Sequence, residues 1–210
     1  VFQDLKDKGQ MPVLVVAPVS LLENWKRECQ KFAPDLSVYI HHGPNRTGRA
    51  IELKQYDVIV ISYNTASSDL SMLKMIDWKC VVLDEAQNIK NPYSDRAKSV
   101  KAITRKSGIA VTGTPFENHI TDIWSLVDFS LPGLLGSLTD FQKNVSDDIL
   151  GAEKIEPILS PVMIRRSVKE VANDLPEKVI IPQPLVMSEA EQRKYEELRC
   201  DAVASANDGA

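Results

Sequence analysis

The amino-acid sequence predicts an α/β fold in which helices cover both faces of a parallel sheet. Short segments of apolar, β-branched residues alternate with helical segments at the spacing of β-α-β units. The strand segments are apolar throughout instead of alternating, which is typical of strands buried on both faces. In a chain of 210 residues, an apolar fraction of 43% is enough for a sizeable core. The functional loops of such sheets lie at the carboxyl ends of the strands.

Five predicted strands share this short, apolar character: Val13–Ala17, Leu36–Ile40, Asp57–Ser62, Cys80–Leu83 and Ile109–Thr112. Polar, turn-forming residues follow four of them, in the segments 18–20, 62–64, 84–87 and 112–115. Because the carboxyl ends of parallel strands meet at one edge of a sheet, we expect these four loops to converge there.

The helices between these strands begin at polar residues that can cap them. The segment Ser20–Glu23 has the pattern of a capping box, and the helix after it repeats apolar residues through Trp25, Cys29 and Phe32. Ser94 is expected to be the N-cap of a later helix. Also predicted are helical segments over 49–54 and 70–76, an interrupted strand over 178–186 and a capped amphipathic helix after Ser188.

Charge and cysteine content exclude several classes of protein. The net charge of −4 and the pI near 5.5 argue against holding nucleic acid by bulk charge alone, but they allow local contacts to phosphate. The three cysteines lie far apart without a C-x-x-C pair, which indicates reduced thiols and not a disulfide framework or a zinc site. No apolar run approaches the length of a membrane span, so no membrane association is expected. Since the chain begins with Val1, we expect it to be part of a longer protein.

Two adjacent carboxylates, Asp84 and Glu85, follow the apolar strand that begins at Cys80. Burying both without partners is costly, so we expect them at the end of the strand, facing a cation or a cleft. An aspartate there can hold Mg²⁺ through oxygen, and a glutamate aimed at a water molecule can act as a general base. The same octapeptide is equally compatible with an ordinary strand that ends in two solvated acids.

Several segments in order resemble one family. Val15–Trp25 is similar to its motif Ia, Val60–Tyr63 to the motif Ib region, Leu83–Asn91 to motif II and Val111–Asn118 to motif III, and the similarity continues through 123–137, 164–167 and 174–178. On these motifs the chain resembles the first RecA-like lobe of Swi/Snf-type DNA-dependent ATPases, in helicase superfamily two. The resemblance covers nearly all of residues 11–199. It implies a RecA-like parallel sheet with helices on both faces, plus a small helical insertion after motif III.

The resemblance implies a role for each matched polar residue. Asp84 would hold Mg²⁺ on the phosphates of ATP, and Glu85 would activate the attacking water. Nucleotide contacts are assigned to Asp84, Gln87, Thr112, Gly113 and Thr114, and DNA contacts to Pro18, Ser20 and Tyr63. The plain structural alternatives are a polar turn residue for Gln87, a sharp turn for Gly113 and a helix cap for Ser20.

The family pattern is incomplete in these residues. The adenine-contacting glutamine segment and the P-loop, which precede motif Ia in the family, are missing, and so is the second RecA-like lobe. The segment Gly43–Ala50 has the glycine spacing of a P-loop, but Arg49 replaces the lysine and Ala50 the Mg²⁺-binding hydroxyl, so an ordinary loop is expected. We therefore expect an ATP-binding lobe without its P-loop at 1–130, a helical protrusion at 131–176, and a return strand and helix at 177–210 that lead toward the absent lobe.

The resulting hypothesis is a fragment of a DNA-stimulated ATPase or translocase, inactive by itself, whose complete form hydrolyses ATP with Mg²⁺ to move on duplex DNA. Contacts to phosphate carry no sequence information, so DNA binding should be sequence-nonspecific. The open sheet edge at Ile109–Thr112 should self-associate or be covered by another segment. A bacterial protein would be cytoplasmic and nucleoid-associated, and a eukaryotic one nuclear. The alternative is a non-catalytic docking module of the same fold.

Overall fold

A computed structural model describes residues 1–114, 119–165, 181–184 and 186–207. The chain divides into two compact units, Val1–Met163 and Ile164–Ala210. The first unit contains the sheet and nearly all of the helices, and the second contributes the helix α11 (Glu189–Asn207). No helix of the described residues is both long enough and apolar enough to cross a membrane.

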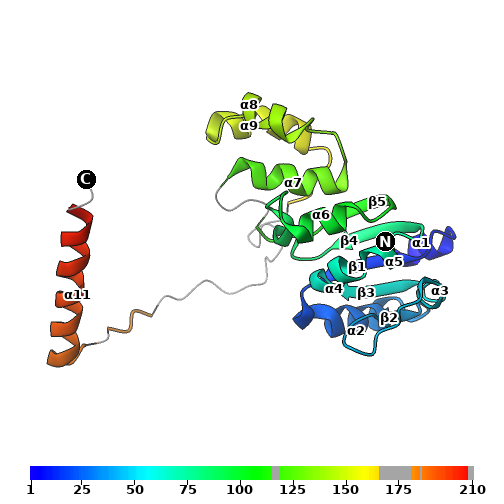
Figure 1. Ribbon diagram of the computed structural model, residues 1–210, viewed down its shortest axis with the longest axis horizontal. Coiled ribbons are helices and arrows are strands. Elements are labelled where there is room, and N and C mark those ends of the chain that lie inside the picture. The colour runs from blue at the N-terminus through cyan, green and yellow to red at the C-terminus, as the bar shows by residue number, and fades with distance from the viewer. Residues whose placement is uncertain (115–118, 166–180, 185, 208–210) are drawn as a thin grey trace. The chain divides into compact units, whose positions relative to one another are not determined.

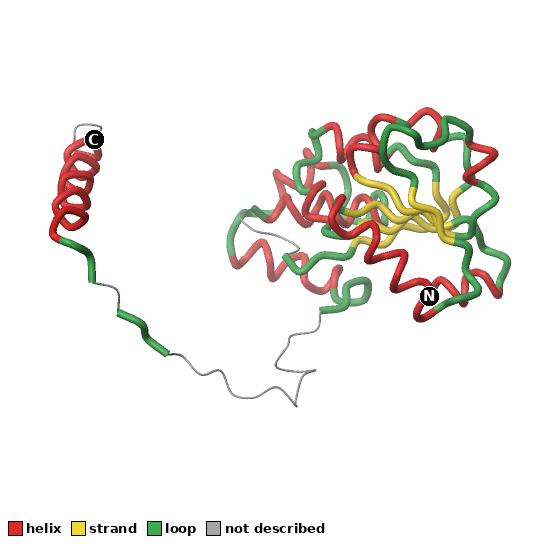
Figure 2. Tube along the Cα trace, turned by 90° about the horizontal axis from the view of Figure 1, so that it is seen from below, coloured by secondary structure: helices red, strands yellow, loops and turns green. Residues whose placement is uncertain are grey.

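The first unit is built on a five-stranded parallel sheet, as the sequence predicts (Figure 1). The strand order is β2-β3-β1-β4-β5, and every neighbouring pair is parallel. Figure 2 shows the strands side by side with helices above and below them. The strands are β1 (Val13–Ala17), β2 (Val38–Ile40), β3 (Val58–Ser62), β4 (Trp78–Leu83) and β5 (Arg105–Ala110).

Helices and short 3-10 turns connect the strands. The helices of the first unit are α1 (Phe2–Asp7), α2 (Leu22–Phe32), α3 (Ala50–Leu53), α4 (Tyr63–Ser68), α5 (Leu70–Leu73), α6 (Asp95–Lys101), α7 (Ile120–Ser130), α8 (Leu138–Asn144) and α9 (Ile149–Leu159). The 3-10 turns are η1 (Val19–Leu21) and η2 (Ala86–Ile89). The expected loop at 62–64 is instead the start of α4, where the Ser62 hydroxyl accepts a hydrogen bond from the backbone N–H of Thr65 at 3.1 Å.

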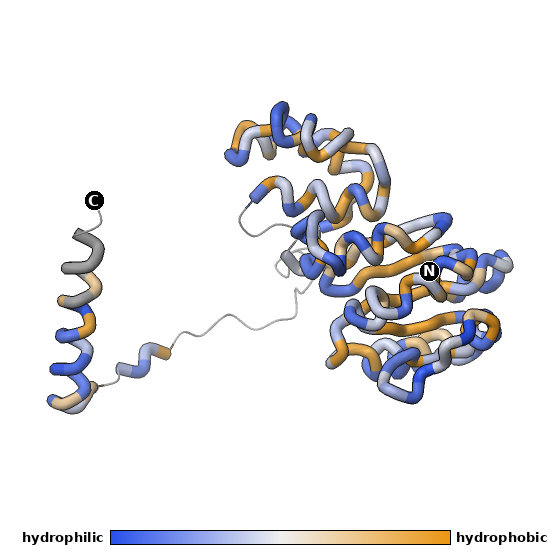
Figure 3. The backbone as a smooth tube through the Cα atoms, viewed as in Figure 1, coloured by the Kyte–Doolittle hydropathy of each residue, from blue (hydrophilic) through white to orange (hydrophobic). Residues whose placement is uncertain are grey.

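Alternate residues of the central strands build two separate cores. The register neighbours Leu14, Ile59 and Val81 belong to the larger core, which side chains of α3 to α7 complete. Val13 and Val58 belong to the smaller core, together with residues of α1 and α2. Since β1, β3 and β4 have helices on both sides, almost all of their residues are buried and apolar, with Lys79 and Ser62 as the polar exceptions (Figure 3).

The predicted start and face of the first long helix are partly wrong. Ser20 lies in η1, and α2 begins at Leu22 without a side-chain cap, so no capping box forms at this point. Cys29 is buried as expected, but Phe32 is the last residue of α2 and is 71% exposed. The Pro18 carbonyl accepts a hydrogen bond from the Leu21 N–H at 2.9 Å, so a backbone turn takes the place of the expected side-chain cap.

The last strand differs most from its prediction. β5 runs over Arg105–Ala110, earlier than the expected Ile109–Thr112, and it is not buried: Ile109 is 37% exposed, and Val111, just after the strand, is 45% exposed. The reason is position, because β5 pairs only with β4 and forms an edge of the sheet. Gly108 allows α7 to pack closely, since a Cβ at this position would lie 3.0 Å from the backbone oxygen of Phe129.

Two predicted caps are confirmed. The Ser94 hydroxyl accepts a hydrogen bond from the Ala97 N–H at 3.2 Å and begins α6. Ser188 and Glu191 form a reciprocal capping box before α11, with the Ser188 N–H donating to Glu191 Oε2 at 2.9 Å. Of the strand expected over 178–186, residues 178–180 and 185 lie outside the described residues, and 181–184 form no regular structure.

A third apolar cluster joins α7 to α8 and α9. Trp124 on α7 packs with Phe141 on α8 and with Ile155 and Leu159 on α9. The Trp124 indole N–H donates to the Gly136 carbonyl oxygen at 3.1 Å, which fixes the loop between α7 and α8. These two helices lie in the region where the sequence predicts a protrusion at 131–176, whose boundaries stay a prediction.

Candidate functional site

Four strands end at the same edge of the sheet, as the sequence predicts. The register pairs Ala17 with Ser62, Val16 with Leu83, and Leu83 with Ala110. The residues that follow these strands are therefore neighbours in space although they are far apart in the chain. The hydrogen bonds among these neighbouring residues define the candidate site.

Asp84 is the first residue after β4, and both oxygens of its carboxylate are held. Its backbone N–H donates to the Val16 carbonyl oxygen at 2.8 Å, which extends the ladder between β4 and β1 by one residue. Asp84 Oδ1 accepts the Glu85 N–H at 2.9 Å, and Asp84 Oδ2 accepts the indole N–H of Trp25 at 2.7 Å. Each oxygen keeps a further lone pair, so the carboxylate is oriented but can still bind a ligand.

Glu85 has a left-handed backbone, with φ 50° and ψ 52°, and it is the only non-glycine residue with positive φ among the described residues. This conformation turns the chain from β4 directly into η2. The Glu85 carbonyl then accepts the backbone N–H of Asn88 at 3.0 Å and its side-chain Nδ2 at 2.9 Å. A left-handed residue with a Cβ is strained, and such strain is concentrated at functional sites.

A chain of hydrogen bonds joins Glu85 to the loop after β5. Gln87 Nε2 donates to Glu85 Oε2 at 2.7 Å, and the Thr112 hydroxyl donates to Gln87 Oε1 at 2.6 Å. The Thr114 N–H in turn donates to the Thr112 hydroxyl oxygen at 3.0 Å, across the exposed bend at Gly113. The side chain of Gln87 is therefore fixed in one orientation between the two loops.

Tyr63 lies beneath the acid pair. Its side chain is only 4% exposed, and its hydroxyl donates to the Asp84 carbonyl oxygen at 2.8 Å. Burial raises the pKa of Tyr63 well above its usual value, and the nearby carboxylates of Asp84 and Glu85 raise it further. The hydroxyl therefore stays protonated. Its assigned role in DNA contact stays a prediction, and the structure places this hydroxyl against the backbone of the site.

The other assigned DNA contacts lie nearer the surface. Pro18 is partly buried and Ser20 is exposed, both immediately after β1. Sequence reasoning missed an exposed arginine close by: Arg96 on α6 donates to the side-chain oxygens of Asn88 and Asn64, at 3.2 Å each. It also missed Trp25, whose regular spacing on α2 marked it only as an apolar core residue.

The site offers oxygen ligands that fit Mg²⁺. Mg²⁺ binds through one or two carboxylates and completes its shell with water and substrate phosphates. Asp84 supplies a fixed carboxylate and Glu85 a second one beside it. Over the residues that the structure describes, no three His, Cys, Asp or Glu side chains come together as a metal cage.

The segment Gly43–Ala50, which has the glycine spacing of a P-loop, is held by structural contacts. His41, at the end of β2, is fully buried and its Nε2 lies 2.8 Å from Asp69 Oδ2. Arg46 contacts both oxygens of Asp69, at 2.6 and 2.9 Å, and donates to the Gly43 carbonyl oxygen. The loop is therefore tied to the start of α5 by its own charged residues.

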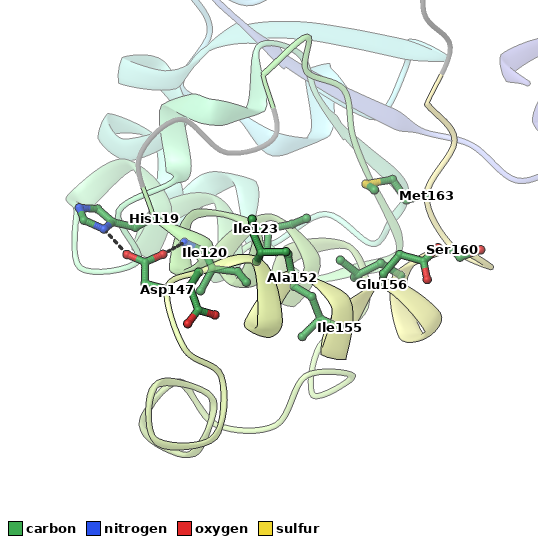
Figure 4. A pocket seen from close by; sticks show the side chains of 12 residues that line it. His119, Ile120, Ile123, Asp147, Ala152, Ile155, Glu156, Ser160 and Met163 are labelled. Carbon is green, nitrogen blue, oxygen red and sulfur yellow. Dashed lines mark hydrogen bonds and ion pairs between the residues drawn. The ribbon is translucent and has the colours of Figure 1, made fainter.

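A cavity of about 510 Å³ lies apart from the acid pair (Figure 4). It is formed between α7 and α9 by mainly apolar side chains, with His119 and Asp147 paired at 2.6 Å at its margin. Asp147 raises the pKa of His119 by accepting its hydrogen bond and by its charge. None of the site residues assigned from the sequence lines this cavity.

A RecA-like sheet with an acid pair at its strand ends defines an ATPase-type lobe, and comparison with known proteins specifies the family. The chain belongs to the family of the SNF2-related domain, which matches residues 2–210. The SWI2/SNF2 ATPase core of Sulfolobus solfataricus, solved in complex with double-stranded DNA, is 41% identical with a TM-score of 0.75. That match covers 84% of this chain and 38% of the solved one.

Two curated relatives agree with this assignment. YwqA of Bacillus subtilis, named as a candidate ATP-dependent helicase/translocase, is 37% identical over 213 residues, which cover 94% of this chain and 23% of YwqA. The TATA-binding protein-associated factor MOT1 of Saccharomyces cerevisiae is 34% identical over 189 residues, covering 81% of this chain and 10% of MOT1. The chain thus spans less than a quarter of these curated relatives, and the predicted family and fold class are confirmed.

Proposed function

We propose that the chain supplies the motif Ia to motif III part of an ATPase lobe that hydrolyses ATP with Mg²⁺ and moves on duplex DNA. One observation carries this proposal: Asp84 and Glu85 lie side by side at the end of β4, one carboxylate fixed by two N–H donors and the other by Gln87. An acid pair that merely ended a strand would need neither the strained backbone of Glu85 nor a dedicated amide partner.

In the proposed reaction each residue has one task. Asp84 would hold Mg²⁺, and the bound ion would supply positive charge next to the phosphates of ATP. Glu85 accepts the proton of the attacking water, and Gln87 fixes the direction of its carboxylate. Thr112 connects this base to the loop at Gly113 and Thr114 through two hydrogen bonds. A change at that loop can thereby alter the position of Glu85.

Duplex DNA is the proposed track. The structural neighbour from Sulfolobus was solved with double-stranded DNA, which supports a DNA-binding role for this lobe. Exposed Ser20, two residues after Pro18, and the side chain of Arg96 lie near the strand ends and suit contacts to phosphate. Since phosphate contacts carry no sequence information, binding should be nonspecific in sequence and should weaken steeply with salt.

We propose that a strand from outside these 210 residues pairs with the open edge of β5. A cavity of about 380 Å³ lies beside this edge, lined by Ile109, Val111 and Val82 as well as by Trp25 and Phe32. An unpaired strand with exposed apolar residues is a template for association. Without that strand, the chain should self-associate, which light scattering at increasing concentration measures. A monomer at all concentrations would contradict this part.

The ATPase proposal is tested by turnover of the full-length protein with and without duplex DNA. We expect Mg²⁺-dependent ATP hydrolysis that duplexes of unrelated sequence stimulate equally, and no turnover by the 210-residue chain alone. The second candidate is a non-catalytic docking module of the same fold. A full-length protein that binds DNA but hydrolyses no ATP would establish that alternative.

A further inference from the structure

The hydrogen bond from Trp25 is one of the two that fix the Asp84 carboxylate, and it is the one that comes from a distant segment. Trp25 lies on α2, 59 residues before Asp84, and its Nε1 approaches Asp84 Oδ2 to 2.7 Å. A distance this short is typical of a hydrogen bond to a charged acceptor, which is about twice as strong as one between neutral groups. The contact is therefore more than packing of an apolar ring.

Packing on the indole ring of Trp25 fixes the direction from which its N–H approaches the Asp84 carboxylate. One face of the indole lies against Phe2, with ring centroids 6.1 Å apart and an interplanar angle of 27°. The ring also packs on the smaller core beneath β1 and β4. Such packing limits the ring to one orientation, so its N–H points in a fixed direction.

The two donors to Asp84 bind different oxygens of its carboxylate. The Glu85 N–H belongs to the neighbouring residue and holds Oδ1, whereas the Trp25 N–H comes from another element and holds Oδ2. One local bond alone would leave the carboxylate free to swing about it. The second donor removes this freedom and presents the remaining lone pairs in one direction.

We propose that Trp25 is a positioning residue for the Mg²⁺ ligand Asp84, acting through its indole N–H. The inference rests on the proposed ATPase function and deepens it. Outer partners of metal-binding residues commonly contribute 10- to 100-fold to metal affinity or activity. Replacement by phenylalanine keeps an aromatic ring against Phe2 and removes only the donor. We therefore expect Trp25→Phe to raise the Mg²⁺ concentration for half-maximal hydrolysis about 10-fold or more.

The first arm of the test uses the 210-residue chain and requires no activity. The chain has three tryptophans, and each indole N–H gives one proton–nitrogen NMR peak, which Trp→Phe variants assign. Asp84→Ala should move the Trp25 peak upfield. The peaks of Trp78 and Trp124 should stay, because their indoles donate to the carbonyl oxygens of Leu73 and Gly136. A Trp25 peak that does not move overturns the proposal.

The second arm uses the full-length protein and measures hydrolysis against Mg²⁺ concentration. Trp124→Phe is the matched control, since it also removes one indole hydrogen bond, on a helix outside the site. The proposal is supported when Trp25→Phe alone raises the Mg²⁺ requirement while maximal rates at high Mg²⁺ recover. An unchanged requirement in an active enzyme overturns it. Absence of turnover in the wild type is a different result, which refutes the ATPase function itself.

Discussion

The backbone of Glu85 leads to a stability prediction with an unusual sign. At ordinary positions glycine is less stable than alanine, because it has more freedom in the unfolded chain, by about 0.5–1 kcal/mol. With φ at 50°, a residue with a Cβ costs about 1–2 kcal/mol that glycine does not. Glu85→Gly should therefore be more stable than Glu85→Ala by about 0.8 kcal/mol, the difference between the midpoints of these two ranges.

Both variants lose the same hydrogen bond from Gln87, so this loss cancels in the difference between their free energies of unfolding. Urea unfolding of the 210-residue chain measures the free energy of each variant by linear extrapolation. The pair Glu28→Gly and Glu28→Ala, at an exposed position within α2, is the control, where glycine should be less stable by about 1 kcal/mol. If glycine were also the less stable variant at position 85, the argument from strain would be refuted.

Three further predictions concern contacts around the sheet. Tyr63→Phe leaves the partly buried Asp84 carbonyl without this donor, and should lower the free energy of unfolding by about 1–3 kcal/mol in urea titration. Ser94→Ala removes the N-cap of α6 and should cost about 1 kcal/mol by the same assay. The pKa of Asp69 is lowered, chiefly by its hydrogen bonds from Arg46. The ionised carboxylate therefore stabilises the fold above its unfolded pKa of about 3.9. This stabilisation is lost as the pH falls through the lower pKa of the folded state. Asp69→Asn should therefore destabilise the chain at about pH 6, and the difference from wild type should shrink toward about pH 3; a constant difference would contradict this assignment.

The sequence is most informative where a residue's environment depends on its own segment. β1 was predicted with its observed bounds, because a strand buried on both faces is apolar throughout. The convergence of the loops at Asp84 and Thr112 followed from topology alone, since parallel strands end at one edge. Ser94 was recognised because a cap acts on the three residues that follow it.

The remainder depends on contacts that local sequence does not encode. The apolar residues of β5 indicated burial, but exposure is decided by whether a further strand lies beside Ile109. The bond from Trp25 to Asp84 joins segments 59 residues apart, and the spacing of Trp25 reports only its place on a helix face. The left-handed backbone of Glu85 could not be predicted, because the residue is neither glycine nor asparagine, the usual residues in this conformation. Strain at such a residue is imposed by the surrounding fold.

The central claim, that Glu85 is the base of an ATPase site, is tested most directly by single-turnover hydrolysis in the full-length protein. Glu85→Gln keeps the size of the side chain and an oxygen that can accept a hydrogen bond, but it cannot accept a proton from water. We expect ATP and Mg²⁺ to bind as in the wild type, while the rate of hydrolysis falls by about 10²- to 10⁴-fold. Hydrolysis by Glu85→Gln at the wild-type rate would contradict the account.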